Sequence, residues 1–563
     1  MLRTVCLIGM LAGLLACGNP TSPEVNLSQG VLTGISKEGI SLYRGIPYAK
    51  PPLGDLRWAA PQAHKGWSGT LHAEAFGPAC WQTQGTGNDL FLAKLTEGAG
   101  MGGFMQWALS TMSGMFLPDI SEDCLTLNVA TPEQRSEPLP VLFWIHGGGH
   151  QFGSGGGPYE SITLTQQGVV LVSINYRLGL YGFFAHPELA AEDPDGSTGN
   201  YGMQDQILAL QWVRDNIREF GGDPDNVTIF GESAGGHSVG QLMASDLAKG
   251  LFHRAIAQSG TGFYQFQAVD KNHERLSGFE AGTKAAEKLG LSAAGAITQM
   301  RSMSTDELAT LAQDEEISAT FHPQIDGYVL KQATAQTFLE GKQAAIPLIV
   351  GSNADEGSVL YYLGLSPIDG HDAEHPQPQT TQEWDNLLDQ AFGNQGQALA
   401  QHYQVDTNND VVKAAEILMG DTWFGRHAYY MATAHAEAGH PSYLYFYERH
   451  PPSEHQTIGA SHALELNHIF DGLIPGWPTD ARDDELRAEM QQMWVSFAQT
   501  GNPNATQTEW ATFNPVAPTE MVFGHERTYT RPPARQARYE LMKDQFMQRV
   551  RHAAGPSMIQ GGH

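Results

Sequence analysis

A serine within a glycine-flanked pentapeptide is the side chain best placed to do chemistry in this chain. Residues 231–235 read GESAG, which fits the pattern G-x-S-x-G, and they directly follow the apolar run 227–230. A sharp turn from a strand into a helix would expose the Ser233 hydroxyl above a sheet, ready to attack an acyl carbon. The flanking glycines suit this turn because they allow close backbone approach. We therefore predict a nucleophile elbow at Ser233, in preference to an ordinary Gly-Ser turn.

A triple glycine after a second apolar run could hold the negative charge that such an attack creates. The glycines occupy 147–149 and follow the run 141–145. Glycine backbones can approach a substrate closely, and the start of a helix favours negative charge. We expect the N–H groups of Gly148, Gly149 and Ala234 to form an oxyanion hole, where one donor stabilises the transition state by roughly 3–4 kcal/mol. A flexible glycine loop is the alternative.

Two histidines, His146 and His150, flank the glycine run and could be taken as metal ligands. No further ligands at metal-binding spacing accompany them, so packing or loop hydrogen bonds explain them better. The predicted chemistry proceeds through an acyl-serine and needs neither a metal nor a cofactor.

Buried strands that alternate with helices must position these segments. Continuous apolar runs suit strands that are buried on both faces of a parallel sheet. The predicted strands are 141–145, 169–174, 227–230, 346–350 and 442–447. Helical spacing occurs over 201–220, 278–311 and 535–551. The predicted fold class is α/β, with a mostly parallel central sheet covered by helices on both faces and antiparallel strands near the N-terminus, within residues 31–58.

The charge balance of the chain is strongly acidic. It has 61 acidic and 32 basic side chains among 563 residues, a formal net charge of −29. Such a surface repels phosphate backbones, so we predict no nucleic-acid partner. It could attract cationic substrates, but a solvated acidic surface is the simpler interpretation. The hydrophobic content of 41% suffices for a large core, and no internal repeat or long linker divides the chain.

The first 16 residues are predicted to be a signal peptide. Arg3 supplies a positive charge, and an apolar stretch too short to span a bilayer ends in the lipobox-like sequence LLAC at 14–17. We predict cleavage before Cys17 and a diacylglycerol on its thiol. A tether would then cover residues 17–30 and a single catalytic domain residues 31–563. The alternative is an ordinary secretory signal with a chance cysteine.

The predicted lipid group is the expected contact of this protein with a membrane. No other segment has about 18 consecutive apolar residues, the length that a membrane-spanning helix needs. No aspartate follows Cys17, which in a Gram-negative cell favours the outer membrane over retention at the inner membrane. A periplasmic or secreted protein is the alternative.

Four cysteines occur in the chain, and two of them remain after the N-terminal segment is set aside. Cys6 lies in the predicted signal peptide and Cys17 is the predicted lipidation site, which leaves Cys80 and Cys124. Export permits a disulfide between these two, and a pair of buried free thiols is the alternative.

Further segments, together with the elbow, resemble type-B carboxylesterases, the family that includes the cholinesterases. The block 199–236 (GNYGMQDQILALQWVRDNIREFGGDPDNVTIFGESAGG) is highly specific for this family. Shorter matches lie at 43–49, 121–125, 175–179, 352–357, 459–462 and 493–504. The resemblance covers nearly the whole mature chain and implies the α/β-hydrolase fold.

The same resemblance implies the acid and the base of the site. The family's acid is the glutamate of a D-E-G element, here Glu356, and its base is the histidine of a G-x-x-H element, here His462. His462 would take the Ser233 proton, and Glu356 would fix its tautomer. The residue types alone do not distinguish His462 from His468, or Glu356 from Asp355.

Structural contacts are implied as well. Cys80 and Cys124 match the ends of the family's first disulfide loop. Arg44 with Glu122, and Arg177 with Asp205, resemble buried ion pairs of the family; such pairs specify geometry more reliably than they add stability.

Two departures from the cholinesterases bear on the substrate. The loop between the two cysteines is longer, and its apolar, methionine-rich segment 85–120 could form a mobile flap, touch a membrane, or pack on the body of the protein. Val359 and Leu360 replace the aromatic residues that follow the acid, which weakens cation–π attraction for a quaternary ammonium group. We therefore do not expect choline esters as the main substrate.

Three aromatic residues, Phe263, Tyr264 and Phe266, are predicted to shape the acyl pocket together with Val359 and Leu360. The expected activity is that of a serine carboxylesterase acting on a small-molecule ester through an acyl-enzyme. One rival is a catalytically silent adhesion or scaffold protein, although such members of the family usually lose the serine. The other is a lipase or a specialised detoxifying esterase with the same chemistry and a different pocket.

Overall fold

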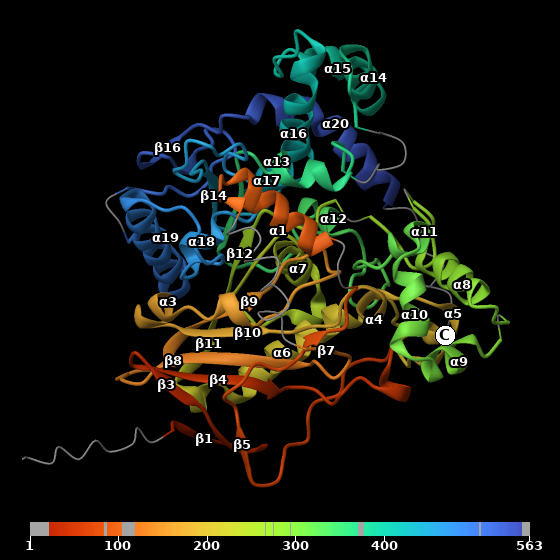
Figure 1. Cartoon of the computed structure of the whole chain (residues 1–563), viewed down its shortest axis with the longest axis vertical. Coiled ribbons are helices and arrows are strands. Elements are labelled where there is room, and N and C mark those ends of the chain that lie inside the picture. Colours follow the sequence, from red (N-terminus) through yellow and green to blue (C-terminus); the bar gives the residue numbers. More distant parts are fainter. Residues whose placement is uncertain are drawn as a thin grey trace, which may run out of the picture.

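The computed structural model describes residues 22–83, 87–103, 119–264, 266–273, 275–292, 294–369, 377–505 and 508–553. The described residues contain an eleven-stranded sheet that runs through the molecule (Figure 1). In spatial order its strands are β16 (Thr528–Arg531), β15 (Glu520–Phe523), β14 (Ser442–Tyr447), β13 (Leu348–Asn353), β12 (Arg254–Gln258), β11 (Gly222–Glu232), β9 (Leu139–Ile145), β10 (Val170–Ile174), β8 (Thr126–Pro132), β4 (Ile40–Pro47) and β3 (Ile35–Lys37). From β10 to β15 neighbouring strands are parallel, and the pairs at the two edges are antiparallel.

The predicted strands all belong to this sheet, and the predicted α/β-hydrolase architecture is confirmed. The sequence prediction missed four strands of this sheet, namely β8, β15, β16 and β12. The last of these, β12, was missed because its five residues RAIAQ form only a short apolar run. It lies between β11 and β13 and carries Gln258 at its carboxyl end.

Alternating side chains of the sheet enter two cores on opposite faces. In β9, Phe143 packs into one core and Trp144 into the other. Both faces are therefore apolar, as expected for strands covered on both sides. One core includes residues of α6 (Tyr201–Asn216), α7 (Ala234–Ala244), α17 (Arg426–Glu437) and α20 (Gln536–Ala553). The other includes residues of α1 (Gly87–Gly98), α3 (Ile162–Gln166), α18 (Leu466–Ile469) and α19 (Ala481–Thr500).

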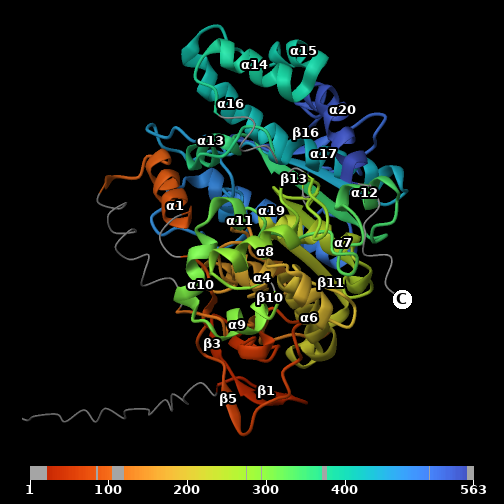
Figure 2. The ribbon, with the colours of Figure 1, turned by 90° about the vertical axis from the view of Figure 1, so that its right-hand side faces the viewer.

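Further helices extend the molecule beyond the sheet. The region 278–311, predicted to be helical, contains α8 (Gly278–Lys288), α9 (Ala296–Ser302) and the start of α10 (Thr305–Ala312). Figure 2 shows α14, α15 and α16 with α20 at one end of the molecule, and β1 and β5 at the other. The other α-helices of the described residues are α4 (Gly179–Phe183), α5 (Pro187–Glu192), α11 (Glu315–Ser318), α12 (Thr334–Leu339), α13 (Gly357–Leu360), α14 (Thr381–Phe392), α15 (Gly396–Ala400) and α16 (Val411–Gly420).

The folded part begins before residue 31, the predicted start of the domain. β1 (Glu24–Leu27) pairs with β2 (Gly30–Thr33), which pairs with β5 (Thr70–His72). Val25 is buried, so the second half of the predicted tether is held by main-chain hydrogen bonds and apolar packing. Cys17 and the predicted signal peptide lie outside the described residues. Within the described ranges, no helix is long and apolar enough to cross a membrane.

The predicted disulfide and one of the two predicted ion pairs are confirmed. Cys80 and Cys124 form a disulfide, and Arg177 contacts the buried Asp205 at 2.8 Å. The disulfide joins the short strand β6 (Ala79–Cys80) to the segment after β7 (Ile120–Ser121), and so closes the long loop.

The predicted pairing of Arg44 with Glu122 is wrong. Arg44 contacts Glu160 at 2.7 Å, while Glu122 is paired with Arg57 at 2.6 Å. The pairing of β4 with β8 shifts register between Tyr43 and Ile46, and Arg44 lies within this irregular stretch. Arg57 is held over Glu122 because its guanidinium also donates to the backbone oxygen of Met303.

Candidate active site

Ser233 lies at the turn between β11 and α7, as the elbow prediction requires. Its backbone is strained, with φ 55° and ψ −122°, a conformation that costs on the order of 1–3 kcal/mol. The Ser233 N–H donates to the Gln258 oxygen at 2.9 Å, which ties the turn to β12. A Cβ atom on Gly235 would lie 1.9 Å from the Ile145 oxygen, so only glycine fits there. The turn therefore holds Ser233 in one position, with its side chain partly exposed.

The glycine run forms a loop that packs directly against this elbow. A Cβ on Gly147 would lie 2.8 Å from the Glu232 oxygen, and one on Gly148 would lie 2.1 Å from the Phe152 oxygen. Gly148 and Gly149 have positive φ values of 97° and 61°. Among the described residues, the N–H groups of Gly148 and Gly149 have no acceptor. They are thus available to an oxygen atom of a bound molecule.

His462 and Glu356 come from two loops at the carboxyl ends of the parallel strands, the same end of the sheet as Ser233. Glu356 follows β13, and His462 lies between β14 and α18. Nδ1 of His462 is 2.6 Å from Oε2 of Glu356, and the N–H of Asn353 donates to the other oxygen of Glu356 at 2.7 Å. Both side chains are buried. This hydrogen bond fixes the orientation of the imidazole ring.

The other imidazole nitrogen faces a second glutamate. Nε2 of His462 is 3.1 Å from Oε1 of Glu232. Burial by itself lowers the pKa of His462, but the negative charges of Glu232 and Glu356 outweigh it and raise the pKa to about 9. Burial raises the pKa of Glu232 to about 8. Among the described residues, Ser233 Oγ forms no hydrogen bond with His462, and Glu232 is the group that faces Nε2.

A third buried glutamate completes this side of the site. Glu465 accepts hydrogen bonds from Gln258 Nε2 at 3.1 Å and from Asn353 Nδ2 at 2.6 Å. Burial raises the pKa of Glu465 to about 7. Gln258 thus contacts Glu465 through its side chain and Ser233 through its backbone. Sequence reasoning did not identify Glu232 or Glu465 as part of the site, although both lie within three positions of a predicted site residue.

Two aromatic rings enclose the imidazole of His462. Phe424, in the π-helical turn before α17, lies 4.7 Å from it between ring centroids, and Phe91 of α1 meets it edge to face at 6.5 Å. α1 is fixed to the histidine loop because the Thr457 N–H donates to the Gly98 oxygen at 2.7 Å. Figure 1 shows α1 beside α13, far in sequence from the other helices of the site. The sequence offered no periodic signal that would have singled out Phe91.

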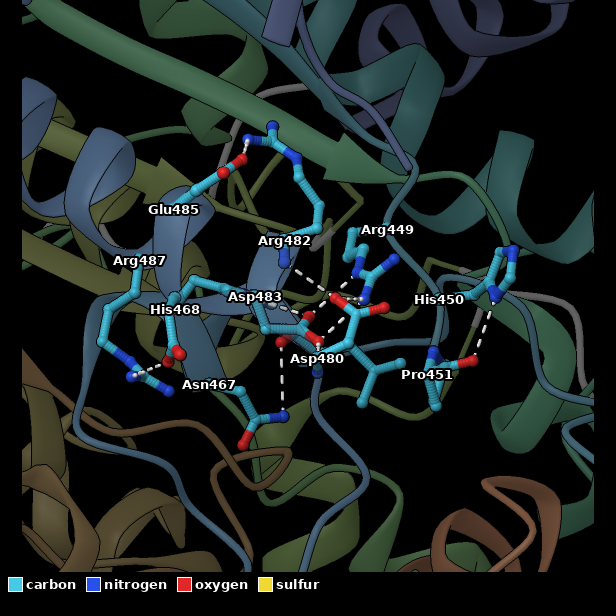
Figure 3. Close-up of polar contacts among 12 residues, drawn as sticks. Arg449, His450, Pro451, Asn467, His468, Asp480, Arg482, Asp483, Glu485 and Arg487 are labelled. Carbon is cyan, nitrogen blue, oxygen red and sulfur yellow. Dashed lines mark hydrogen bonds and ion pairs between the residues drawn. The ribbon is translucent and has the colours of Figure 1, made fainter. Parts of the chain in front are cut away.

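The structure separates His462 from the rival His468. Nε2 of His468 is 3.1 Å from Oδ1 of Asp483, whose carboxylate is also held by Arg449 (Figure 3). Nδ1 of His468 faces the Tyr447 hydroxyl at 3.1 Å. Both nitrogens of His468 are thus engaged in a polar cluster that fastens α18 to the start of α19. His468 positions the loop, and His462 is the histidine beside the elbow.

Asp355 is likewise engaged elsewhere. Its carboxylate accepts the Ala460 N–H at 3.0 Å and lies 3.4 Å from the Lys413 ammonium group. The hydrogen bond from Ala460 connects the two loops that carry Glu356 and His462.

The five predicted pocket residues are not equally close to the site. Tyr264 lies 4.6 Å, between ring centroids, from His237, which is one helical turn after Ser233, and 5.8 Å from Trp423. Phe263 and Phe266 are buried and pack on Phe546 of α20. Tyr264 is therefore the aromatic residue of the three that contacts side chains around the elbow.

The two aliphatic pocket residues lie on α13. Val359 is buried in the same core as Leu95 of α1, and Leu360 is partly buried against the cluster that includes α16. Val359 thus packs with α1 and Leu360 with α16, each as part of an apolar cluster.

A strained serine elbow, a glycine loop with unpaired N–H groups and a histidine–glutamate pair, all at one edge of a mostly parallel sheet, define an α/β-hydrolase. Residues 21–545 match the model of the Carboxylesterase family, and the chain belongs to that family.

Two relatives and a solved structure agree with this assignment. The chain is 34% identical to Fumonisin B1 esterase of Sphingopyxis macrogoltabida, over 86% of this chain and 83% of the relative. It is 33% identical to Para-nitrobenzyl esterase of Bacillus subtilis, over 92% of this chain and 99% of the relative. A solved structure of PNB esterase superposes with a TM-score of 0.74 and 30% identity, covering 93% of this chain and 99% of that one. The protein is a serine carboxylesterase, a hydrolase of carboxylic esters.

Proposed function

We propose that Ser233, His462 and Glu356 form the catalytic triad of this esterase and that Gly148, Gly149 and Ala234 supply its oxyanion hole. The observation that carries the proposal is the 2.6 Å contact of the buried Glu356 with His462, at the edge of the sheet where Ser233 is strained.

The proposed reaction begins with His462 in its neutral form, in which the Nδ1–H donates a hydrogen bond to Glu356 and Nε2 carries no proton; Nε2 then accepts the proton of Ser233 Oγ. Ser233 Oγ then bonds to the ester carbon, and the carbonyl oxygen becomes an oxyanion held by backbone N–H groups. The imidazolium returns the proton to the leaving alcohol oxygen as the carbon–oxygen bond breaks. Water, activated by His462, hydrolyses the acyl-serine in the same way and restores the hydroxyl.

Hydrolysis of p-nitrophenyl butyrate by the purified mature protein, beside Ser233→Ala, tests this function. We expect the wild type to release p-nitrophenol with a burst of one equivalent if deacylation is slower than acylation, and the variant to release almost none. Equal rates for two folded proteins would refute Ser233 as nucleophile. A folded but inactive wild type would favour a catalytically silent binding protein.

The names of the relatives suggest the first substrate panel. p-Nitrobenzyl esters and fumonisin B1 test whether this chain shares the substrates in those names, and p-nitrophenyl esters of increasing length test the acyl pocket beside Tyr264. A choline ester completes the panel. It tests the prediction that choline esters are poor substrates. That prediction took Val359 and Leu360 as pocket residues, whereas both pack against apolar clusters.

We propose that the segment 85–120 acts as a flap over the site. Support comes from α1, whose Phe91 contacts the His462 ring; residues 104–118 lie outside the described ranges. Replacing 104–118 by a short glycine-serine linker should change the acyl-chain preference. An unchanged preference would contradict the flap.

We also propose export with a lipid on Cys17, which would place the enzyme at the outer membrane. Support comes from the LLAC sequence at 14–17. In cells, the wild type should partition into the detergent phase of Triton X-114 and Cys17→Ser into the aqueous phase. Aqueous partitioning of both would favour a periplasmic or secreted enzyme.

A further inference from the structure

The residue that follows the glycine run, His150, shares its unusual backbone conformation. His150 has φ 59°, beside values of 97° and 61° at Gly148 and Gly149. An L side chain adopts this left-handed conformation at an energetic cost, and such strain persists only where the surroundings hold it. The His150 oxygen accepts the Gly179 N–H at 2.7 Å. The strained position is therefore fixed, and it lies directly beside the predicted donors.

The imidazole of His150 connects the glycine loop to the helix that follows the nucleophile. Its Nε2 is 3.0 Å from Ser238 Oγ, and this hydroxyl also accepts a hydrogen bond from Gln206 Nε2 at 3.0 Å. All three side chains are fully buried. Ser238 lies one turn after Ala234 on α7. Burial holds the pKa of His150 well below 6.5, so the ring is neutral and the bond persists over the working pH range.

We propose that His150 is a positioning residue whose hydrogen bond to Ser238 sets the separation between the two halves of the oxyanion hole. One half is the loop with Gly148 and Gly149, and the other is the α7 terminus with Ala234. The inference rests on the proposed function, because it assumes that these N–H groups converge on one oxyanion. Donors that are displaced by a fraction of an ångström still allow substrate to bind but hold the tetrahedral intermediate less well.

The test compares binding of a tetrahedral adduct with binding of a ground-state ligand. An aryl trifluoromethyl ketone forms a hemiketal with the serine, which places an oxyanion in the hole, whereas the corresponding benzylic alcohol cannot. In His150→Phe, we expect kcat/KM for p-nitrophenyl butyrate to fall about 10- to 100-fold, with KM changed less than about threefold. The affinity for the ketone should fall by the same factor and the affinity for the alcohol should not change.

Two variants separate positioning from loss of stability. His435 is also a fully buried histidine, bonded to Gln343 and to the Ile346 oxygen near the start of β13, at the opposite edge of the sheet. His435→Phe should lower the melting temperature without changing the ratio of ketone to alcohol affinity. His150→Gln, which can place an amide nitrogen near the original Nε2, should regain much of the ketone affinity. If His150→Phe does not fold, Ser238→Ala removes the same bond and takes its place.

The outcomes distinguish this inference from the proposed function. A wild type that neither hydrolyses the ester nor binds the ketone would refute the proposed function. An active wild type with an unchanged affinity ratio in both His150→Phe and Ser238→Ala would refute the role of His150. A reduced ratio in either variant, restored in His150→Gln, would support it.

Discussion

The two halves of the active site use different parts of the polypeptide. The half proposed to receive the oxyanion is built from backbone, with glycines at 147–149 and the strained turn at Ser233. The half proposed to move the proton is built from buried side chains, with His462 between Glu356 and Glu232. Activity that relies on backbone N–H groups requires positions without side chains, so substitutions there should lower the rate by displacing the backbone. Activity that relies on ionisable side chains requires particular charges, so substitutions there should change how the rate depends on pH.

The largest expected effect lies in the proton-transfer half. Glu356→Gln should lower kcat by roughly 10⁴-fold, because the amide can no longer hold the imidazole in the tautomer that accepts the serine proton. Steady-state kinetics with p-nitrophenyl butyrate measures this loss. The matched variant Asp355→Asn should lose less than about tenfold, since Asp355 contacts the histidine loop and not the ring. A similar loss in both variants would show that loop position, and not the charge on Glu356, governs the reaction.

The backbone half should show the next largest effect. Gly148→Ala should reduce kcat by about 10²–10³-fold, the usual consequence of losing one oxyanion donor, because its Cβ would lie 2.1 Å from the Phe152 oxygen and would displace the loop. The pH profile should keep its shape. Gly168→Ala serves as the control, since it has a φ of 89° and open space around the added Cβ. Loss of activity in that variant would point to left-handed strain as the cause.

Removal of the second carboxylate should shift the pH dependence. The negative charge of Glu232 helps to raise the pKa of His462, and the reaction needs the neutral imidazole. In Glu232→Gln the histidine pKa should therefore fall, and the rising limb of kcat/KM should move to lower pH by ~1 unit. Glu465→Gln should cause a smaller shift, because Glu465 contributes less to the histidine pKa. A shift to higher pH would contradict the assigned charge interaction.

The smallest effect is expected from the aromatic contact on the imidazole. Phe91→Ala removes an edge-to-face pair worth about 0.5–1.5 kcal/mol, so kcat/KM should fall by about 2- to 10-fold, most for esters with large leaving alcohols. Leu90→Ala, a change at the exposed neighbour on the same helix, should have no effect on the rate. Equal losses in the two variants would indicate that α1 as a whole is perturbed.

The backbone half was the more predictable of the two from sequence. Ser233 and the glycines can be recognised from short sequence patterns, because a strand, a tight turn and a helix N-terminus require particular residues at fixed positions. His462 and Glu356 lie on loops far apart in sequence, and only the family resemblance selected them over His468 and Asp355.

Other features depend on three-dimensional packing that no local pattern encodes. The long-range partners of Arg44 could not be predicted, since a register shift in β4 turns the arginine toward Glu160. Phe91 meets His462 because α1 lies against the histidine loop, to which the Gly98 oxygen is hydrogen-bonded. The fold class followed from the buried apolar runs, whereas β12 was missed because its run is short.

Gln258, at the end of that missed strand, links the two halves. Its backbone oxygen holds the Ser233 N–H, and its amide group contacts Glu465 and accepts a hydrogen bond from Trp494 Nε1 at 3.2 Å. Two contacts of different kinds therefore meet at one residue. A substitution of Gln258 keeps the backbone oxygen that holds the Ser233 N–H but removes the amide contacts to Glu465 and Trp494, so it can alter the polar surroundings of His462 while the elbow stays in place.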